Sequence, residues 1–177
     1  MASGDFESGP PGIDAIELSR VVDRGIRESG ALDMKKLSIE SGKKMWMVYI
    51  DIYPINDAGN LFDTCALAAL AALKDARFPE YDGEKIKYDK RTDKSLPLTE
   101  LPISCTIRKL GDKLFVDPTK NEDMLADTRL TVAVNKNGTL CALQKGGDAG
   151  LTAGEIKEMC QMAVKSSKLI RKELDKK

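Results

Sequence analysis

The segment 61–76 limits the folds open to this chain more than any other part of the sequence. It consists almost entirely of Leu, Ala, Cys and Phe, and its only charges are Asp63, Lys74 and Asp75. A helix that has no broad polar face is buried on most of its sides. The composition therefore predicts a helix at 61–76 that is buried nearly all round and forms a core element of the fold.

The segment before this helix indicates a β-strand. Residues 45–55 are rich in β-branched and aromatic side chains, and Asp51 is their only charge. Such a run predicts a strand buried on both faces, which Pro54 should end. Further upstream, Asp14 and Glu17 have the spacing of a helix N-cap and its acidic partner. An amphipathic helix is therefore expected to begin at Asp14.

The second half of the chain is predicted to contain a small sheet and a long helix. Residues 78–96 are rich in Lys, Asp and Glu and indicate a solvated connector. Asn137-Gly138 is a hairpin signal, and Thr152 with Glu155 indicates the capping box of a terminal helix. Four short strands are expected at 103–107, 113–116, 130–134 and 139–143. Together these elements predict an α/β (α+β) fold.

Composition excludes several kinds of chemistry. The chain has no His, so it cannot build a Ser-His-Asp triad, a Cys-His pair or an imidazole metal site. Its 28 Lys and Arg balance its 28 Asp and Glu, so net charge gives no general attraction to nucleic acid. The spacing of the cysteines fits neither zinc nor a CxxC pair. Their apolar or small neighbours predict buried free thiols, which fit a reducing cytoplasm, for Cys65, Cys105, Cys141 and Cys160. No segment approaches the roughly 18 apolar residues of a membrane span, so no membrane partner is expected.

Arginines recur along one face of the first expected helix. Arg20, Arg24 and Arg27 are spaced i, i+4 and i+7. Guanidinium groups one helical turn apart match successive phosphates of an extended nucleic-acid strand. Acidic residues are interleaved with them, however, so ion pairs on a solvated helix face explain the spacing equally well.

Carboxylates gather between two of the expected strands. Glu122, Asp123 and Asp127 could hold a divalent metal or supply a general acid. Acidic turns between strands are common, so the spacing alone favours a structural role. The glycine-containing segment 145–150 lacks the residues of a phosphate-binding motif and is interpreted as a plain loop.

Four stretches of the sequence closely resemble one family. They are ESGPPGIDAIELSRVVDRGIRE at 7–28, GNLFDTCALAALAA at 59–72, LPIS at 101–104 and VDPT at 116–119. Together they resemble the non-catalytic RNase PH-like ring subunit of the archaeal exosome. The resemblance implies an RNase PH-like fold, related to the βαβ architecture of ribosomal protein S-five.

The resemblance also implies a division of the chain. Residues 1–12 would form a flexible leader, 13–77 the remainder of the first RNase PH-like half, 78–96 the connector, and 97–177 the second half with its C-terminal helix. Members of this family carry further strands ahead of the stretch that begins this chain. An N-terminally truncated form of the fold is therefore expected.

The function implied by the resemblance is that of a scaffold in a cytoplasmic hexameric ring. The subunit would alternate with a catalytic RNase PH-like sister, which uses inorganic phosphate to shorten single-stranded RNA from its 3′ end, and RNA-binding cap subunits would join the ring. In the family, two arginines of the first helix face the partner's active site, which points to Arg20 and Arg24, with Arg27 on the same face.

This chain is not expected to catalyse the reaction alone. In the active sister a phosphate loop precedes the buried helix, and the matching stretch here has Asn60 and Leu61 where a hydroxyl and a guanidinium are expected. Asp123 and Asp127 are interpreted as relics of the active family's acids, with no metal and no cofactor in this chain.

Two alternatives to this reading are open. The chain could be an active phosphorolytic 3′-to-5′ exoribonuclease in which Asp123 and Asp127 are catalytic. It could also be a purely structural assembly subunit, whose arginines pair with acids of a partner and never contact RNA.

Overall fold

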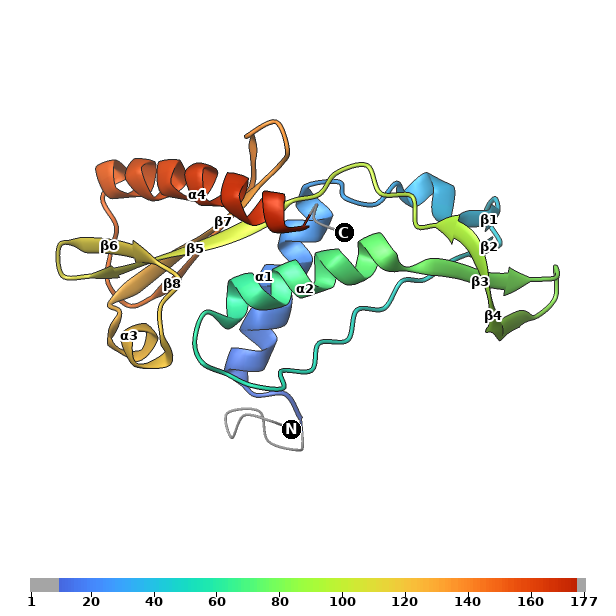
Figure 1. Cartoon of the computed structure of the whole chain (residues 1–177), viewed down its shortest axis with the longest axis horizontal. Coiled ribbons are helices and arrows are strands. Elements are labelled where there is room, and N and C mark those ends of the chain that lie inside the picture. Colours follow the sequence, from blue (N-terminus) through green and yellow to red (C-terminus); the bar gives the residue numbers. More distant parts are fainter. Residues whose placement is uncertain (1–9, 175–177) are drawn as a thin grey trace.

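The computed structural model describes residues 10–174, which form an elongated molecule (Figure 1). A four-stranded sheet occupies one end and two small hairpins occupy the other, with helices between them. Residues 1–9 of the expected leader and residues 175–177 lie outside the described residues. In the part of the chain from 10 to 174, no helix has both the length and the apolar character needed to cross a membrane.

The four-stranded sheet is antiparallel and contains the main core. Its strand order is β6-β5-β7-β8, and its strands are β5 (Ile103–Leu110), β6 (Lys113–Val116), β7 (Thr128–Val134) and β8 (Leu140–Gly147). All four lie where the sequence predicts strands. The turn between β7 and β8 forms at Asn137-Gly138 as expected, and Gly138 has a φ of +86° that favours glycine there.

Helices cover both faces of this sheet. Helix α4 (Ala153–Leu174) packs on β5 and β7, while α2 (Leu61–Asp75) and α1 (Ile13–Glu28) pack on β5 and β8 respectively. The capping box predicted for α4 is confirmed, because the Thr152 N–H donates to Glu155 Oε2 at 2.7 Å and the Glu155 N–H donates to Thr152 Oγ1 at 3.3 Å. The core beneath α4 contains Leu70, Ile103, Ile107, Val132 and Met159.

Helix α1 is capped two residues earlier than predicted. Its N-cap is Gly12, which makes no side-chain hydrogen bond to the helix, and Asp14 lies within the first turn. The prediction of an Asp14 cap is therefore wrong, although a carboxylate in the first turn still favours the helix dipole. The helix lies close to the sheet at Gly25, where an added Cβ would be 3.3 Å from Ser104 Oγ and 3.7 Å from Ala133 Cβ.

Helix α2 is less enclosed than predicted. Cys65, Ala69, Leu70 and Leu73 are buried, but a second face is exposed at Thr64, Ala68, Ala71 and Ala72. The expectation of burial nearly all round is wrong because the exposed side is built from small residues. These place little apolar surface in water, so one side of the helix tolerates exposure.

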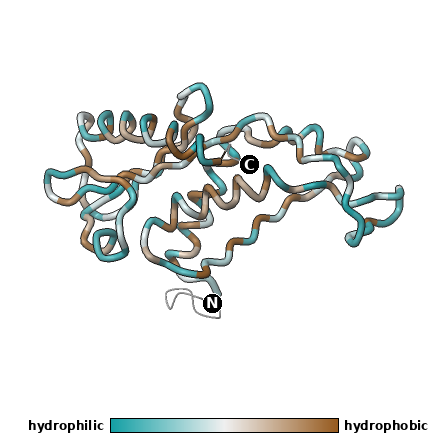
Figure 2. The backbone as a smooth tube through the Cα atoms, viewed as in Figure 1, coloured by the Kyte–Doolittle hydropathy of each residue, from teal (hydrophilic) through white to brown (hydrophobic). Residues whose placement is uncertain are grey.

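The segment 45–55 is not the doubly buried strand that the sequence predicts. The hairpin of β1 (Ser38–Glu40) and β2 (Lys44–Met45) ends as this segment begins. The chain then runs extended beneath α2, and Figure 2 shows apolar residues along it. Val48 and Ile52 are half-buried, whereas Tyr49 and Tyr53 are exposed. Only one face of the segment is packed. In the described part of the chain, no strand pairs with 46–55 at either edge.

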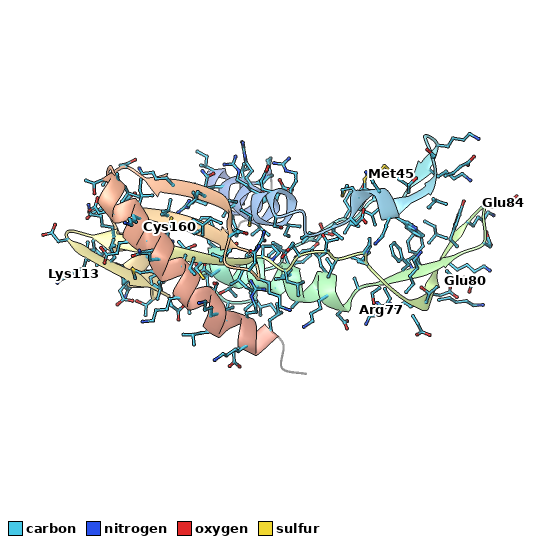
Figure 3. The ribbon with its side chains drawn as sticks, turned by 90° about the horizontal axis from the view of Figure 1, so that it is seen from above. Met45, Arg77, Glu80, Glu84, Lys113 and Cys160 are labelled. Carbon is cyan, nitrogen blue, oxygen red and sulfur yellow. The ribbon has the colours of Figure 1, made fainter. Side chains whose placement is uncertain are left out.

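The expected connector at 78–96 is a β-hairpin and not a solvated loop. Strands β3 (Arg77–Tyr81) and β4 (Ile86–Ser95) pair antiparallel, with irregular register. The charged residues remain at the surface, whereas Phe78 is buried and anchors the hairpin. Its ring lies 5.3 Å from that of Trp46, which holds the hairpin beside β1 and β2. The sequence pattern does not reveal this contact. Figure 3 shows Met45, Arg77 and Glu84 toward this end, with Lys113 and Cys160 toward the other.

The cysteines are free thiols with unequal burial. Cys65 and Cys105 are buried, and Cys141 and Cys160 are half-buried, so the prediction of buried thiols holds fully for the first two. Burial, together with the nearby Asp63 carboxylate, raises the pKa of Cys105 to about 12. That thiol is protonated and behaves as a small apolar core residue.

Candidate functional site

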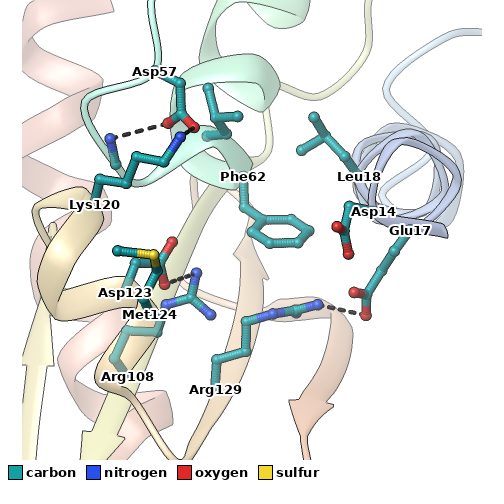
Figure 4. Close-up of a pocket in the computed structure, with 12 residues that line it drawn as sticks. Asp14, Glu17, Leu18, Asp57, Phe62, Arg108, Lys120, Asp123, Met124 and Arg129 are labelled. Atoms are coloured by element: carbon teal, nitrogen blue, oxygen red, sulfur yellow. Dashed lines mark hydrogen bonds and ion pairs between the residues drawn. The ribbon is translucent and has the colours of Figure 1, made fainter. Parts of the chain in front are cut away.

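A pocket of about 400 Å³ opens at the N-terminal end of α2, between α1 and the sheet (Figure 4). Three cationic side chains from three different elements line it: Arg108 of β5, Arg129 of β7 and Lys120 of α3 (Lys120–Leu125). Four acidic side chains also line it: Asp14, Glu17, Asp57 and Asp123. The pocket is therefore rich in charge of both signs.

The two arginines are neighbours because of the sheet register. Arg108 and Arg129 lie directly opposite each other on β5 and β7, and they are only 6% and 4% exposed. Both guanidinium groups pack against the ring of Phe62 from α2, at 5.7 Å and 4.0 Å from its centroid. Like charges directly opposite in a sheet repel each other, so this arrangement needs counter-charges.

Acids of the pocket provide these counter-charges. Glu17 Oε1 lies 2.5 Å from Arg129 Nη2, and Asp123 pairs with Arg108. Burial lowers the pKa of Arg108, and the Asp123 carboxylate opposes that shift. Gly146 completes the enclosure, because any Cβ there would lie 2.5 Å from the guanidinium of Arg129.

The loop before α2 is locked onto the segment that leads into α3. Gly59 has a φ of +115°, and a Cβ there would lie 2.3 Å from the carbonyl oxygen of Pro118. Asn60, the N-cap of α2, donates from Nδ2 to Asp117 Oδ1 at 3.0 Å. Lys120 pairs with Asp57 at 3.0 Å. The fold thus brings together two stretches that lie far apart in the sequence, the one around Asn60 and Leu61 and the acidic one around Glu122 and Asp123.

The first turn of α2 is also bonded to the sheet. Asp63 accepts from the Thr106 N–H at 2.9 Å and from the Thr106 hydroxyl at 2.7 Å. Desolvation raises the pKa of Asp63, although these hydrogen bonds oppose the rise. The carboxyl group therefore fixes the start of α2 against β5, which positions Phe62 over the two arginines.

The three candidate acids have different surroundings. Asp123 lines the pocket and pairs with Arg108. Glu122 belongs to the capping box of α3 with Thr119. Asp127 lies outside the pocket lining, where its Oδ2 accepts from the Gly111 N–H at 2.8 Å. The acids do not converge, and no group of three potential ligands for a metal is found among residues 10–174.

The arginine stripe on α1 divides among three environments. Arg24 donates from Nη1 to Gln144 Oε1 of β8 at 2.7 Å. Arg27 is exposed and lies 3.5 Å from Asp23 and 3.7 Å from Glu28. Arg20 is exposed beside the extended segment at 48–52, and it forms no ion pair with any described residue. Although the three arginines share one helical spacing, only Arg27 lies beside acids. Arg20 and Arg24 have no acidic partner among the described residues.

Sequence reasoning missed the two buried arginines. Each interrupts an otherwise apolar or β-branched strand, Arg108 after Thr106-Ile107 and Arg129 before Leu130-Thr131. A charged residue inside a buried strand is rarely tolerated without a partner. That pattern was a usable signal for a polar site, although the pairing of the two arginines depends on a register that the sequence does not display.

Comparisons with known proteins agree on one family. Domain 1 of the 3′ exoribonuclease family matches residues 1–79, and domain 2 matches residues 100–166. Exosome complex component Rrp42 of Methanocella arvoryzae is 43% identical over 175 residues, which covers 99% of this chain and 65% of that protein. The protein of the same name from Archaeoglobus fulgidus is 42% identical, with 97% and 64% covered.

Solved structures give the same result. A chain of a structure described as the Archaeoglobus fulgidus exosome with RNA bound to the active site superposes with a TM-score of 0.87 and 41% identity, covering 98% of this chain and 66% of that one. A chain of an archaeal exosome core gives 0.82 and 39%, with 92% and 64% covered. The chain thus spans less than two thirds of the length of these relatives. Because the two domain matches together cover most of the sequence and the fold agrees, the chain belongs to the 3′ exoribonuclease, or RNase PH-like, family.

Proposed function

We propose that this chain is a non-catalytic ring subunit of an archaeal-type RNA exosome in the cytoplasm. It would hold a catalytic RNase PH-like partner in a hetero-hexameric ring, with RNA-binding cap subunits, and guide single-stranded RNA with Arg20 and Arg24. Inorganic phosphate would be used by the partner. The observation that carries the non-catalytic part is the pairing of every cation lining the pocket with an acid of the same pocket.

Phosphate attack needs donors that are free to hold the anion. In this pocket Arg108, Lys120 and Arg129 are each held by a carboxylate, and four acids face three cations. The guanidinium nitrogens that lack a partner, Arg108 Nε and Arg129 Nη1, are buried, so an incoming phosphate would have to displace a carboxylate, which leaves an acid beside the anion. The N-cap Asn60 is itself bonded to Asp117. These features support the proposal that the charged groups of the pocket stabilise the fold and do not bind the attacking phosphate.

RNA guidance is assigned to Arg20 and Arg24 because their charges lack an acidic partner. Arg24 is oriented by the neutral amide of Gln144, which leaves its positive charge available. Arg20 is exposed one helical turn away. Guanidinium groups at this spacing would contact phosphates without reading bases, so the grip should be independent of RNA sequence.

Arg27 provides a matched control on the same helix face. It carries the same charge, but it lies beside Asp23 and Glu28, so this charge is already balanced. The test combines this chain with the catalytic partner, isolates the ring by size, and measures phosphate-dependent shortening of a single-stranded RNA. We expect Arg20→Glu with Arg24→Glu to give intact rings that hold RNA weakly, whereas Arg27→Glu has a small effect.

Salt dependence gives the quantitative signature. Each phosphate contact to a single strand contributes about −0.7 to the slope of log affinity against log salt. Neutral replacements, Arg20→Gln with Arg24→Gln, should therefore reduce the magnitude of the slope by about 1.4. Rings that fail to assemble with these variants would favour a purely structural role, and phosphate-dependent activity from this chain alone would refute the non-catalytic assignment.

A further inference from the structure

A groove of about 180 Å³ lies between the turn that joins β7 to β8 and the C-terminal half of α4 (Figure 1). Four of the side chains that line it are cationic: Lys136 of the turn, and Lys168, Arg171 and Lys172 of the helix. None of the described residues that line it is acidic. The groove therefore differs from the pocket at the start of α2, where each cation is paired with an acid.

Arg171 is the cation that the fold holds in place. Its half-buried side chain donates from Nη1 to the Leu101 carbonyl at 2.5 Å and from Nη2 to the Val134 carbonyl at 3.0 Å. A guanidinium has five N–H donors, so these two bonds do not exhaust its capacity. Both partners are neutral, and no carboxylate among residues 10–174 pairs with Arg171. Its positive charge is therefore fixed beside the groove and is not balanced.

The three lysines come from two separate elements. Lys168 and Lys172 lie in the last two turns of α4, where positive charge also favours the helix dipole. The dipole does not account for Lys136, which reaches the same groove from the turn between β7 and β8. All three are exposed and form no ion pair with a described residue. Their convergence without counter-charges creates a local positive potential that attracts an anion.

The lining favours a nucleic-acid strand over an acidic protein as the source of that anion. Val164 is the only large apolar side chain among the described residues of the groove. Protein–protein interfaces have apolar centres and are depleted in lysine, whereas interfaces with nucleic acid are more polar and much more positive. A water molecule needs only about 10–15 Å³ of such space, so the groove has room for a phosphate group.

The positive lining ends at the neighbouring hollow, which Lys136 also lines. That second hollow contains Glu100 as well as Lys74, so its charge is mixed. A carboxylate there would repel the phosphates of a strand. Contacts are therefore expected at one or two phosphates in the groove itself.

We propose that this groove binds phosphate groups in the backbone of a single-stranded nucleic acid. It lies on the side of the sheet that α4 covers, whereas Arg24 meets the opposite side at Gln144. The groove is therefore a separate contact from the one assigned to Arg20 and Arg24. The inference goes beyond the proposed function and does not rest on it, because a strand can bind here whether or not α1 contacts RNA.

The experiment measures binding of a short labelled single-stranded RNA to the full chain by fluorescence anisotropy. Lys168→Gln with Lys172→Gln should weaken binding at least tenfold at about 0.1 M salt, because two phosphate contacts are lost. The matched control is Lys157→Gln with Lys165→Gln, at positions that are also exposed on α4 but lie outside the groove. It removes the same net charge, so it corrects for general attraction and should change the affinity less than about twofold.

Amide hydrogen exchange locates the bound strand. RNA should slow exchange at 135–138 and 167–172, while exchange in β5 should be the same in every variant, which shows that the fold is intact. Two further samples contain inorganic phosphate or a polyglutamate peptide at the same concentration of negative charge. Neither should slow exchange at the groove as strongly as RNA, because a free ion lacks the linked contacts of a strand and the lining offers a peptide few apolar contacts.

The same measurement in a chain that carries Arg20→Gln and Arg24→Gln separates this inference from the proposed function. Effects of distant sites add in free energy, so the groove variant should cause the same fold-change in that background. If α1 does not contact RNA, the arginine replacements alone will leave the affinity unchanged, and the groove variant will still weaken it.

Several results would overturn this inference. The unmodified chain could fail to bind RNA, or could bind it without slower exchange at the groove. The groove variant could also bind RNA as tightly as the control variant. Polyglutamate that slows exchange as strongly as RNA would assign the groove to an acidic protein instead, and inorganic phosphate that does so would assign it to the free ion.

Discussion

Replacing Asp123 with Asn removes the carboxylate that neutralises Arg108. The Arg108 side chain is only 7% exposed and that of Asp123 is 26% exposed. Removing one partner of a buried ion pair costs about 3–5 kcal/mol, because the other charge stays buried. Solvent at Asp123 reduces this cost, whereas Arg129 directly opposite adds repulsion. The expected loss in the free energy of unfolding is therefore about 2–3 kcal/mol.

Urea denaturation at pH 7 measures this loss. With a slope of about 2 kcal/mol per molar, the midpoint should fall by roughly 1 M. The matched control is Glu158→Gln on the exposed surface of α4, which should leave the midpoint within about 0.25 M of the original. Arg108→Met combined with Asp123→Leu should recover most of the loss, because apolar residues of similar size replace buried pairs well.

A small effect of the single replacement would refute this reasoning. If Asp123→Asn changed the free energy of unfolding by less than about 0.5 kcal/mol, Arg108 would not depend on its carboxylate. The same variant also separates stability from catalysis. Assembled rings should degrade RNA at the original rate per ring, and a collapse of that rate with stability intact would make Asp123 a catalytic acid.

Three further predictions concern packing and pH. Met159→Ala should cost about 3 kcal/mol in urea unfolding, because this side chain is fully buried beneath α4. Gly59→Ala should cost about 3 kcal/mol, because its φ and the Pro118 carbonyl leave no room for a Cβ. The Lys109 ammonium is the main cause that lowers the pKa of Glu155 to about 2 from its ordinary 4.5. The stabilisation by Glu155 should therefore be complete above pH 4.5 and lost as pH falls toward 2, and Glu155→Gln should flatten this loss in Tm scans.

Local patterns predicted the second half of the fold well. Strands around Cys105 and Val132, the turn at Gly138 and the cap at Thr152 all depend on residues a few positions apart. The hairpin at 78–96 turns locally at Asp82-Gly83, where the Asp82 carboxylate accepts from the Glu84 and Lys85 N–H groups, and its charged composition concealed that signal. Another error lies where distant partners decide the outcome. Residues 45–55 have a strand pattern, but a sheet requires neighbours that the described chain does not provide.

The candidate site was predicted in part for the same reason. The stretch around Asn60 and the acid Asp123 were recognised, and they do meet at one pocket. The buried pair of Arg108 and Arg129 was missed because cross-strand neighbours follow from register. Helical spacing grouped the arginines of α1, but only the structure distinguishes Arg24, bonded to Gln144, from the ion-paired Arg27.

The position of α1 on β8 has a consequence for protein synthesis. Arg24 and its partner Gln144 are 120 residues apart in the chain. A ribosome that adds about 5–20 residues per second needs roughly 6–24 s to bridge that interval. During this time Leu18 and Val22 can already pack on α2, but the face of α1 that meets the sheet at Gly25 has no sheet to cover it. Part of the first helix thus stays exposed in the nascent chain almost until the last strand is made, and the yield should depend on chaperones that hold emerging polypeptides.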